Sequence, residues 1–165
     1  QKANLFTGTI ADNIRFGAPD ASMEEVIHAA KIAQAYDFIM EKPHQFDELI
    51  TEGATNVSGG QKQRLSIARA LIRKPLIYIY DDSFSALDFR TDAKLRKALK
   101  TEVTRSIVLI VAQRVSTIMD ADRIVVLDEG KIAGIGTHRE LLSSCPLYYE
   151  IAASQLSEEE LQYEC

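Results

Sequence analysis

The sequence predicts an α/β protein in which a helical region precedes part of a parallel sheet. Three short apolar runs predict strands of that sheet, at residues 76–80, 106–111 and 124–127. Helical stretches separate these runs, and near-continuous apolar strands that alternate with helices are typical of a parallel sheet covered on both faces. The region before Pro75 has helical patterns instead. We therefore expect helices in residues 10–74 and a sheet region in residues 75–156.

The length and composition are those of one globular domain. The chain has 165 residues, enough for a core of its own, with 46% hydrophobic and 26% charged residues. Its net charge of −5 gives no basis for sequence-independent binding of nucleic acid, and the basic residues of segment 62–74 are expected to form a solvated helix face. The two cysteines, Cys145 and Cys165, make no disulfide framework and fit a reducing compartment. No apolar run in the sequence approaches the ~20 residues that a membrane-spanning helix needs.

Three helices are expected before Pro75, joined by irregular segments. Ser22 followed three residues later by Glu25 forms a capping box, which predicts a helix start. Pro75 cannot continue a helix and therefore marks the end of the third one. In chain order we expect a loop with a short helical turn (1–18), the helix from Ser22, a short helix (35–40), an irregular polar stretch (44–57) and a helix from about Gly60 to Arg73.

After Pro75 the expected strands alternate with helices. The helix between the first two strands covers residues 91–102, and Asp128 to Lys131 predicts a hairpin turn that leads into a further strand. One terminal helix is expected over residues 138–155. The acidic residues 157–165 are expected to be frayed and disordered.

The most informative segment is Ser58-Gly59-Gly60-Gln61, which stands directly before the amphipathic stretch 65–72. Glycine has no Cβ, so the backbone here can approach a ligand closely. A serine at a helix start caps the helix and offers a hydroxyl, and the free N–H groups of the first turn attract anions. We therefore predict a helix start that contacts phosphate. A flexible turn before a surface helix is the alternative for these four residues alone.

The longer sequence SGGQKQRLSIARAL resembles the signature motif of the ATP-binding-cassette (ABC) ATPases. The resemblance extends from residue 1 to about residue 155, with five motifs in the family's order, and the stretch 5–14 makes it closest to the exporter type. It implies the C-terminal part of a P-loop (RecA-like) ATPase domain with an inserted α-helical subdomain. The implied division is a Q-loop (1–9), a helical subdomain ending in the signature helix (10–74), the second half of the ATPase core (75–156) and an acidic tail (157–165).

A second motif is the apolar strand that ends in Asp81 and Asp82. A carboxylate at the carboxyl edge of a parallel sheet lies where ligands bind in α/β folds, and Mg²⁺ prefers oxygen ligands. A strand that merely ends in two solvated aspartates is the alternative. The resemblance implies a Walker B strand in which Asp81 holds Mg²⁺, with Gln1 as a second metal contact. It also implies ATP-binding roles for these residues of the signature and the D-loop: Ser58, Gly59, Gly60, Gln61 and Asp88.

Two residues depart from the catalytic pattern of the family. Asp82 stands where the family has a catalytic glutamate, and its side chain is shorter by one bond, roughly 1.5 Å, which places its carboxylate too far from an attacking water. Gln113 stands where the family has a switch histidine; its amide can donate to a phosphate oxygen but cannot become cationic. The predicted catalytic positions, Asp82 and Gln113, therefore belong to a weakened site. This pattern resembles the degenerate half of a heterodimeric multidrug-type exporter.

The sequence contains no G-x-x-x-x-G-K-[ST] phosphate loop. Since the first residue is Gln1 and not methionine, we expect a fragment whose phosphate loop lies N-terminal to Gln1 and which does not hydrolyse ATP by itself. For the parent protein the resemblance implies an ATPase that drives export, with ATP and Mg²⁺ as cofactors. A regulatory module that holds nucleotide without hydrolysing it is the alternative.

The resemblance also implies partners. These are a second nucleotide-binding domain from a different subunit, and the transmembrane domains of the same transporter, which the loop at Glu52-Gly53 would touch. The implied location is the cytoplasmic face of the cell membrane. A role on DNA, which some ABC ATPases have, is disfavoured by the negative net charge and by the exporter-like stretch 5–14.

Overall fold

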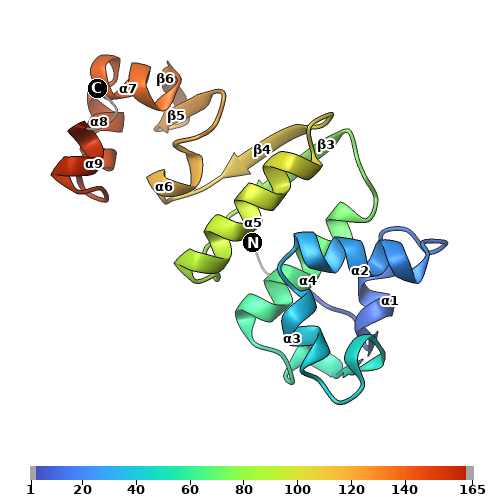
Figure 1. Ribbon diagram of the computed structural model, residues 1–165. Helices are drawn as coiled ribbons and strands as arrows, with labels where there is room; N and C mark the ends of the chain where they lie inside the picture. The colour runs from blue at the N-terminus through green and yellow to red at the C-terminus, as the bar shows by residue number, and fades with distance from the viewer. Residues whose placement is uncertain (1–2, 163–165) are drawn as a thin grey trace. The chain divides into compact units, whose positions relative to one another are not determined.

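The computed structural model describes residues 3–162, which form two compact units that divide between Val111 and Ala112 (Figure 1). The elements of the first unit are β1 (Gly8–Thr9), α1 (Ile10–Arg15), α2 (Met23–Ile32), α3 (Tyr36–Met40), the 3-10 turn Gln45–Asp47, β2 (Leu49–Ile50), the 3-10 turn Glu52–Ala54, α4 (Gly59–Leu71), β3 (Ile77–Asp81), α5 (Phe89–Glu102) and β4 (Ile107–Val111). None of the helices in the described residues is long and apolar enough to cross a bilayer.

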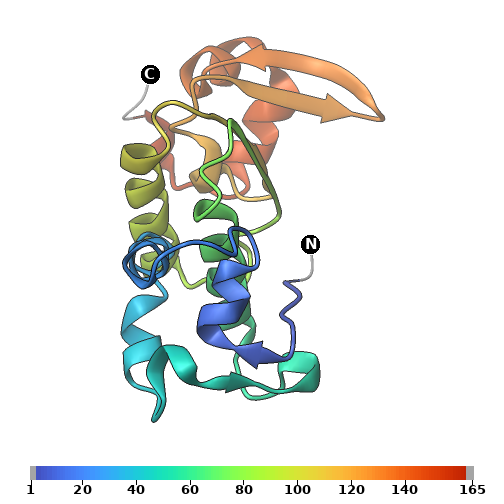
Figure 2. The ribbon, with the colours of Figure 1, turned by 90° about the vertical axis from the view of Figure 1, so that its right-hand side faces the viewer.

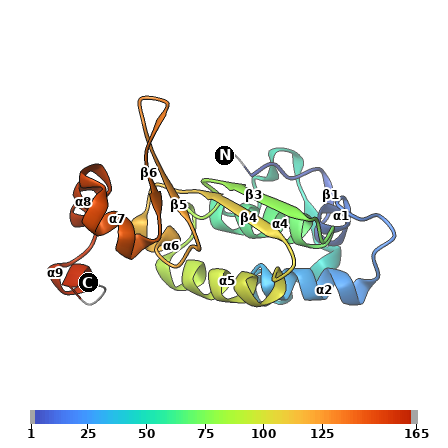
Figure 3. The same ribbon diagram turned by 90° about the horizontal axis from the view of Figure 1, so that it is seen from above.

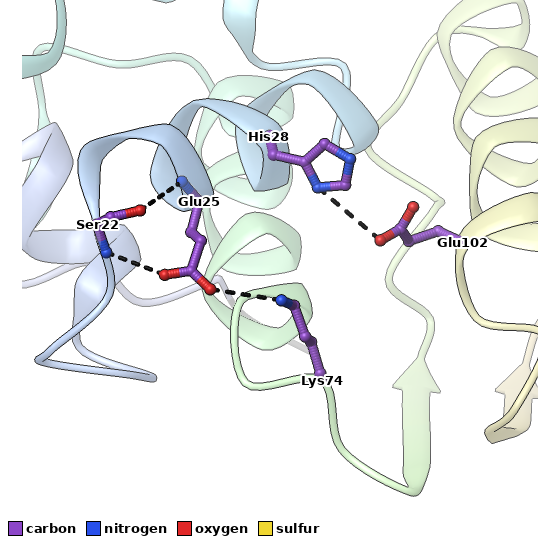
Figure 4. Close-up of polar contacts among 5 residues, drawn as sticks. All are labelled: Ser22, Glu25, His28, Lys74 and Glu102. Atoms are coloured by element: carbon purple, nitrogen blue, oxygen red, sulfur yellow. Dashed lines mark hydrogen bonds and ion pairs between the residues drawn. The ribbon is translucent and has the colours of Figure 1, made fainter.

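Capping boxes start α1, α2 and α4, which confirms the prediction at Ser22. The Ser22 hydroxyl accepts a hydrogen bond from Glu25 N, and the Glu25 carboxylate accepts one from Ser22 N (Figure 4). The other oxygen of Glu25 lies 3.4 Å from the ammonium of Lys74, and His28 lies 3.8 Å from Glu102 at the end of α5. These pairs are exposed and add little stability, but they show that α2 lies beside both Lys74 and α5.

The strands β3 and β4 form the parallel pair that the sequence predicted. Ile77 pairs with Ile107 and Asp81 with Val111, in continuous register. Tyr78 and Tyr80 point into the core of the unit, which they share with residues of α1, α2, α4 and α5. Figure 3 shows α4 and α5 on the same side of this strand pair. The helices of segment 10–74 and the β3–α5–β4 segment therefore have one common core.

One face of the β3–β4 pair has no covering layer among the described residues, although parallel sheets are typically covered on both faces. Ile79 is 69% exposed and Ile107 is 60% exposed, because the alternating side chains of both strands leave one apolar face without a covering layer. The exposed members of this face are Ile77, Ile79, Ile107, Leu109 and Val111.

Because contiguous exposed apolar surface promotes association, the isolated 165-residue chain is expected to self-associate through this face. Ile79 and Leu109 are register partners at its centre, so the double variant Ile79→Lys/Leu109→Lys is expected to restore a monomer. Light scattering over a range of protein concentrations measures the result. A wild-type chain that stays monomeric and unfolds cooperatively would contradict the expectation.

The second unit has its own core, formed by residues such as Val115, Val126 and Leu141. Its elements are α6 (Val115–Ile118), β5 (Ile124–Asp128), β6 (Lys131–Gly136), α7 (His138–Ser144), α8 (Pro146–Ala153) and α9 (Glu158–Gln162). Figure 2 shows β5 and β6 as a two-stranded ribbon. The predicted turn is confirmed: Glu129 and Gly130 both have positive φ, as a two-residue type I′ hairpin loop requires.

The antiparallel pairing of β5 with β6 is the hairpin that this turn predicts. Two other expectations for this unit were wrong. The terminal helix is broken at Pro146, which starts a new helix because proline fits the first helical position. The tail is not frayed over its described part: α9 forms there, and Leu161 packs against the core of the unit.

Candidate functional site

The predicted phosphate-contacting segment lies at the start of α4. Ser58 is the N-cap residue, and its hydroxyl oxygen accepts from Gln61 N at 3.2 Å. In return, the Gln61 side-chain oxygen accepts from Ser58 N at 3.0 Å. This capping box fixes the helix start and orients Ser58. It uses the hydroxyl of Ser58 as an acceptor, so the hydroxyl hydrogen is left to donate to a ligand oxygen.

The two glycines that follow, Gly59 and Gly60, have different surroundings. A Cβ at Gly59 would meet nothing within 4 Å, so the backbone there faces open space that a ligand can enter. A Cβ at Gly60 would stand 3.1 Å from Ala86 O, a tight contact, so the loop after β3 lies close to the backbone of Gly60. The structure therefore brings the start of α4 next to the 83–88 loop. The first turn of α4 has no acidic residue, which leaves it attractive to anions.

Asp81 and Asp82 lie at the carboxyl end of β3, where the sequence placed them. Asp81 is exposed and has no salt-bridge partner among residues 3–162. Asp82 leaves the extended conformation: its φ is 49°, and its N–H donates to Val111 O at 2.9 Å. The hydroxyl of Ser85 donates to Asp82 O at 3.0 Å. Aspartate tolerates this left-handed backbone better than most residues.

Asp88 has a structural role that the sequence analysis did not assign. It is the N-cap residue of α5, and its carboxylate accepts from Thr91 N at 3.0 Å. The hydrogen bonds with Thr91 lower the pKa of Asp88, so the cap is ionised at neutral pH. The side chain is exposed at the end of the 83–88 loop, on the same segment that approaches Gly60.

Gln113 lies in the second unit. Gln155 holds its loop: the Gln155 amide nitrogen donates to Gln113 O at 2.9 Å, and the Gln155 amide oxygen accepts from Val115 N at 2.8 Å. The Gln113 side chain is exposed. Sequence reasoning missed Gln155, because nothing in the local pattern links residues 42 positions apart. Gln1, the other predicted metal contact, lies outside the described residues.

The donor set fits Mg²⁺ bound with a nucleotide. No group of three or more His, Cys, Asp or Glu in the described part of the chain is arranged to hold a metal by itself. Mg²⁺ commonly binds through one or two carboxylates together with substrate phosphates and water. Asp81 has an exposed carboxylate at the sheet edge, which is a ligand of this kind.

The geometry agrees with a solved structure of a bacterial Atm1-family ABC exporter with ATP bound. The two structures superpose with a TM-score of 0.90 at 40% sequence identity, over 96% of this chain and 28% of the exporter chain. The fold is therefore part of an α/β P-loop ATPase domain.

The comparison with sequence families gives the narrower assignment. The family model described as ABC transporter matches residues 1–85. An uncharacterized ABC transporter ATP-binding protein of Bacillus subtilis, YfiB, is 47% identical over 159 residues, and ATP-binding cassette sub-family B member 5 of Homo sapiens is 45% identical over 155 residues. The alignments cover 96% and 94% of this chain but only 27% and 12% of those relatives. The chain belongs to the ABC transporter family.

Proposed function

We propose that this chain is the ATP-binding region of an ABC exporter, in which ATP binding and hydrolysis drive export of a substrate across the membrane. The observation that carries the proposal is the helix start at Ser58, with an open approach at Gly59 and the 83–88 loop packed on Gly60. Because the chain spans 27% of the Bacillus subtilis relative, the activity is assigned to a full-length transporter that contains it. Such a protein works at the cytoplasmic face of the membrane, with its own transmembrane domains.

The signature segment is assigned to a nucleotide held by a second nucleotide-binding domain. Ser58 and Gly59 supply the hydroxyl and backbone N–H donors for the terminal phosphate, and Gln61 keeps Ser58 oriented. Asp88 lies at the end of the loop that packs on Gly60 and belongs to the same nucleotide-binding surface. All of these elements are intact, so the site that they complete is expected to hydrolyse ATP.

The chain's own site is assigned a mainly nucleotide-holding role. Asp81 would hold Mg²⁺, which neutralises phosphate charge when bound. Asp82 has a side chain one bond shorter than the family's glutamate, which leaves its carboxylate too far from a water at that position. Gln113 can donate one hydrogen bond but cannot carry a proton. We therefore infer a heterodimer in which the second subunit provides the hydrolytic site's phosphate loop and general base.

One alternative has a specific observation in its favour. In this alternative neither of the two nucleotide sites hydrolyses ATP, and the assembly is a regulatory module that only holds nucleotide. Asp82 and Gln113, which stand in place of the family's glutamate and histidine, favour it. Restoring those two residues separates the alternatives, because a purely regulatory domain gains no hydrolysis from them.

The metal role of Asp81 can be tested in the full-length transporter. Asp81→Asn removes the negative charge, and Mg²⁺-dependent ATP binding at the chain's own site is expected to weaken by about tenfold, equivalent to ~1.4 kcal/mol. Asp128→Asn is the matched control, since Asp128 also ends a strand and is exposed. Binding is measured with and without Mg²⁺. An Asp81→Asn protein that keeps the full Mg²⁺ dependence would contradict the assignment.

A further inference from the structure

The guanidinium of Arg69, in the last turn of α4, holds the segment that begins the described chain. Its three nitrogens each donate a hydrogen bond of 2.9 Å: Nε to Asn13 O, one terminal nitrogen to Asn4 O and the other to Asn13 Oδ1. Within residues 3–162 no carboxylate forms a salt bridge with Arg69. The Arg69 guanidinium therefore donates to neutral oxygens in these three hydrogen bonds. Its planar set of N–H groups matches the positions of those oxygens, and the ammonium of a lysine would not.

Two aromatic rings complete the surroundings of this guanidinium. The Cζ atom of Arg69 lies 4.8 Å from the ring centre of Phe6 and 5.8 Å from that of Phe16, and the two ring centres lie 4.5 Å apart. Burial lowers the pKa of Arg69, which nevertheless stays charged at neutral pH. The cation–π contacts thus add to the hydrogen bonds and fix Phe6 and Phe16 against α4.

Asn13 makes the held segment rigid. Its side chain is buried, and its amide nitrogen donates to Phe6 O at 2.8 Å and to Thr9 O at 3.0 Å. Its amide oxygen accepts from Phe6 N as well as from Arg69. The chain just after α1 also lies close to the backbone of α4, since a Cβ added at Gly17 would stand 2.4 Å from Arg69 O. Residues 4–17 therefore form one body with the last turn of α4.

The other end of the same helix carries the candidate nucleotide contacts. Arg69 follows Ser58 by 11 residues (69 − 58), which corresponds to a distance of about 16 Å along a continuous helix. A helix of this length is rigid, so a tilt at Arg69 moves Ser58 and Gly59. We propose that Arg69 is a positioning residue that fixes the angle of α4 on segment 4–17 and thereby aligns Ser58 with its phosphate. This rests on the proposed function of Ser58.

The test uses ATP hydrolysis by the full-length transporter with Arg69→Lys, which keeps the charge but loses the fork. A small misplacement of the reacting groups is costly, so kcat is expected to fall about tenfold while the KM for ATP stays within about twofold. The matched control is Arg73→Lys, one turn further along and exposed, which is expected to keep the wild-type kcat. A purely structural role of Arg69 would lower the unfolding temperature but leave kcat per folded molecule unchanged, and that result would overturn the proposal.

A milder variant decides the question if Arg69→Lys does not fold. Phe6→Leu removes one cation–π contact from a partly exposed position and is expected to lower kcat about threefold. If Arg69→Lys does fold, the double variant Phe6→Leu/Arg69→Lys is expected to have the same kcat as Arg69→Lys alone, because both changes disturb the same interaction. A wild-type kcat for Phe6→Leu would overturn the proposal. The proposed function is tested separately by Ser58→Arg: if that variant is inactive while Arg69→Lys is fully active, only the role of Arg69 fails.

Discussion

Replacing Ser58 with arginine is expected to lower ATP hydrolysis by the full-length transporter by about 10²–10³-fold, the loss typical of removing a donor aimed at transition-state charge. Ser58 is exposed at the start of α4, next to the open space at Gly59. An arginine side chain would occupy that space and hold the neighbouring subunit's phosphate away from the helix start. The measurement is kcat for ATP, together with ATP binding to show that the partner's site still loads nucleotide.

The matched control for this variant is Ser22→Arg. Ser22 caps α2 with the same capping box, a hydroxyl that accepts from the third residue and a glutamate that accepts in return. Loss of a cap costs about 0.5–2 kcal/mol, so both variants should lose a similar amount of stability. Only Ser58→Arg should lose hydrolysis. Equal losses in both variants would assign the effect to helix capping and remove the support for a nucleotide contact.

The second large effect is expected from restoring the family's catalytic residues. The double variant Asp82→Glu/Gln113→His should increase hydrolysis at the chain's own site, by up to about 10²–10⁴-fold, which is the usual contribution of a positioned general base. Hydrolysis at this site is isolated by inactivating the general base of the partner subunit. Each single variant shows how much the two positions contribute separately.

The backbone at Asp82 sets a limit on this gain. Its φ of 49° is a conformation that glutamate adopts less readily than aspartate, so the longer side chain is expected to lower stability slightly. Thermal unfolding separates that cost from catalysis. If the double variant folds, binds ATP and still hydrolyses none at this site, the regulatory nucleotide clamp becomes the better account of this half of the transporter.

Features with strong local signals could be predicted from the sequence. The capping boxes at Ser22 and Ser58 involve residues three apart, and the strand that ends in Asp81 is bounded by Pro75 on one side and a carboxylate pair on the other. The hairpin turn at Glu129-Gly130 requires positive φ, which glycine supplies. Of these elements, the start of α4 and the end of β3 carry most of the candidate site.

The remaining features depend on contacts that no local pattern specifies. Gln155 reaches Gln113 from a helix end 42 residues away, and Arg69 reaches Asn13 across 56 residues. Asp82 has its positive φ at the point where the chain leaves β3. There its N–H donates to Val111 O, which is a tertiary contact. The break at Pro146 did have a local signal, the proline itself, which the expectation of one terminal helix overlooked.

The proposed nucleotide contact can be seen in a structure of the intact transporter with trapped ATP. We expect Ser58 Oγ and Gly59 N to lie within about 3 Å of oxygens of the terminal phosphate of a nucleotide bound to the neighbouring subunit's phosphate loop. A structure in which both nucleotides are enclosed while Ser58 and Gly59 face bulk solvent would contradict it.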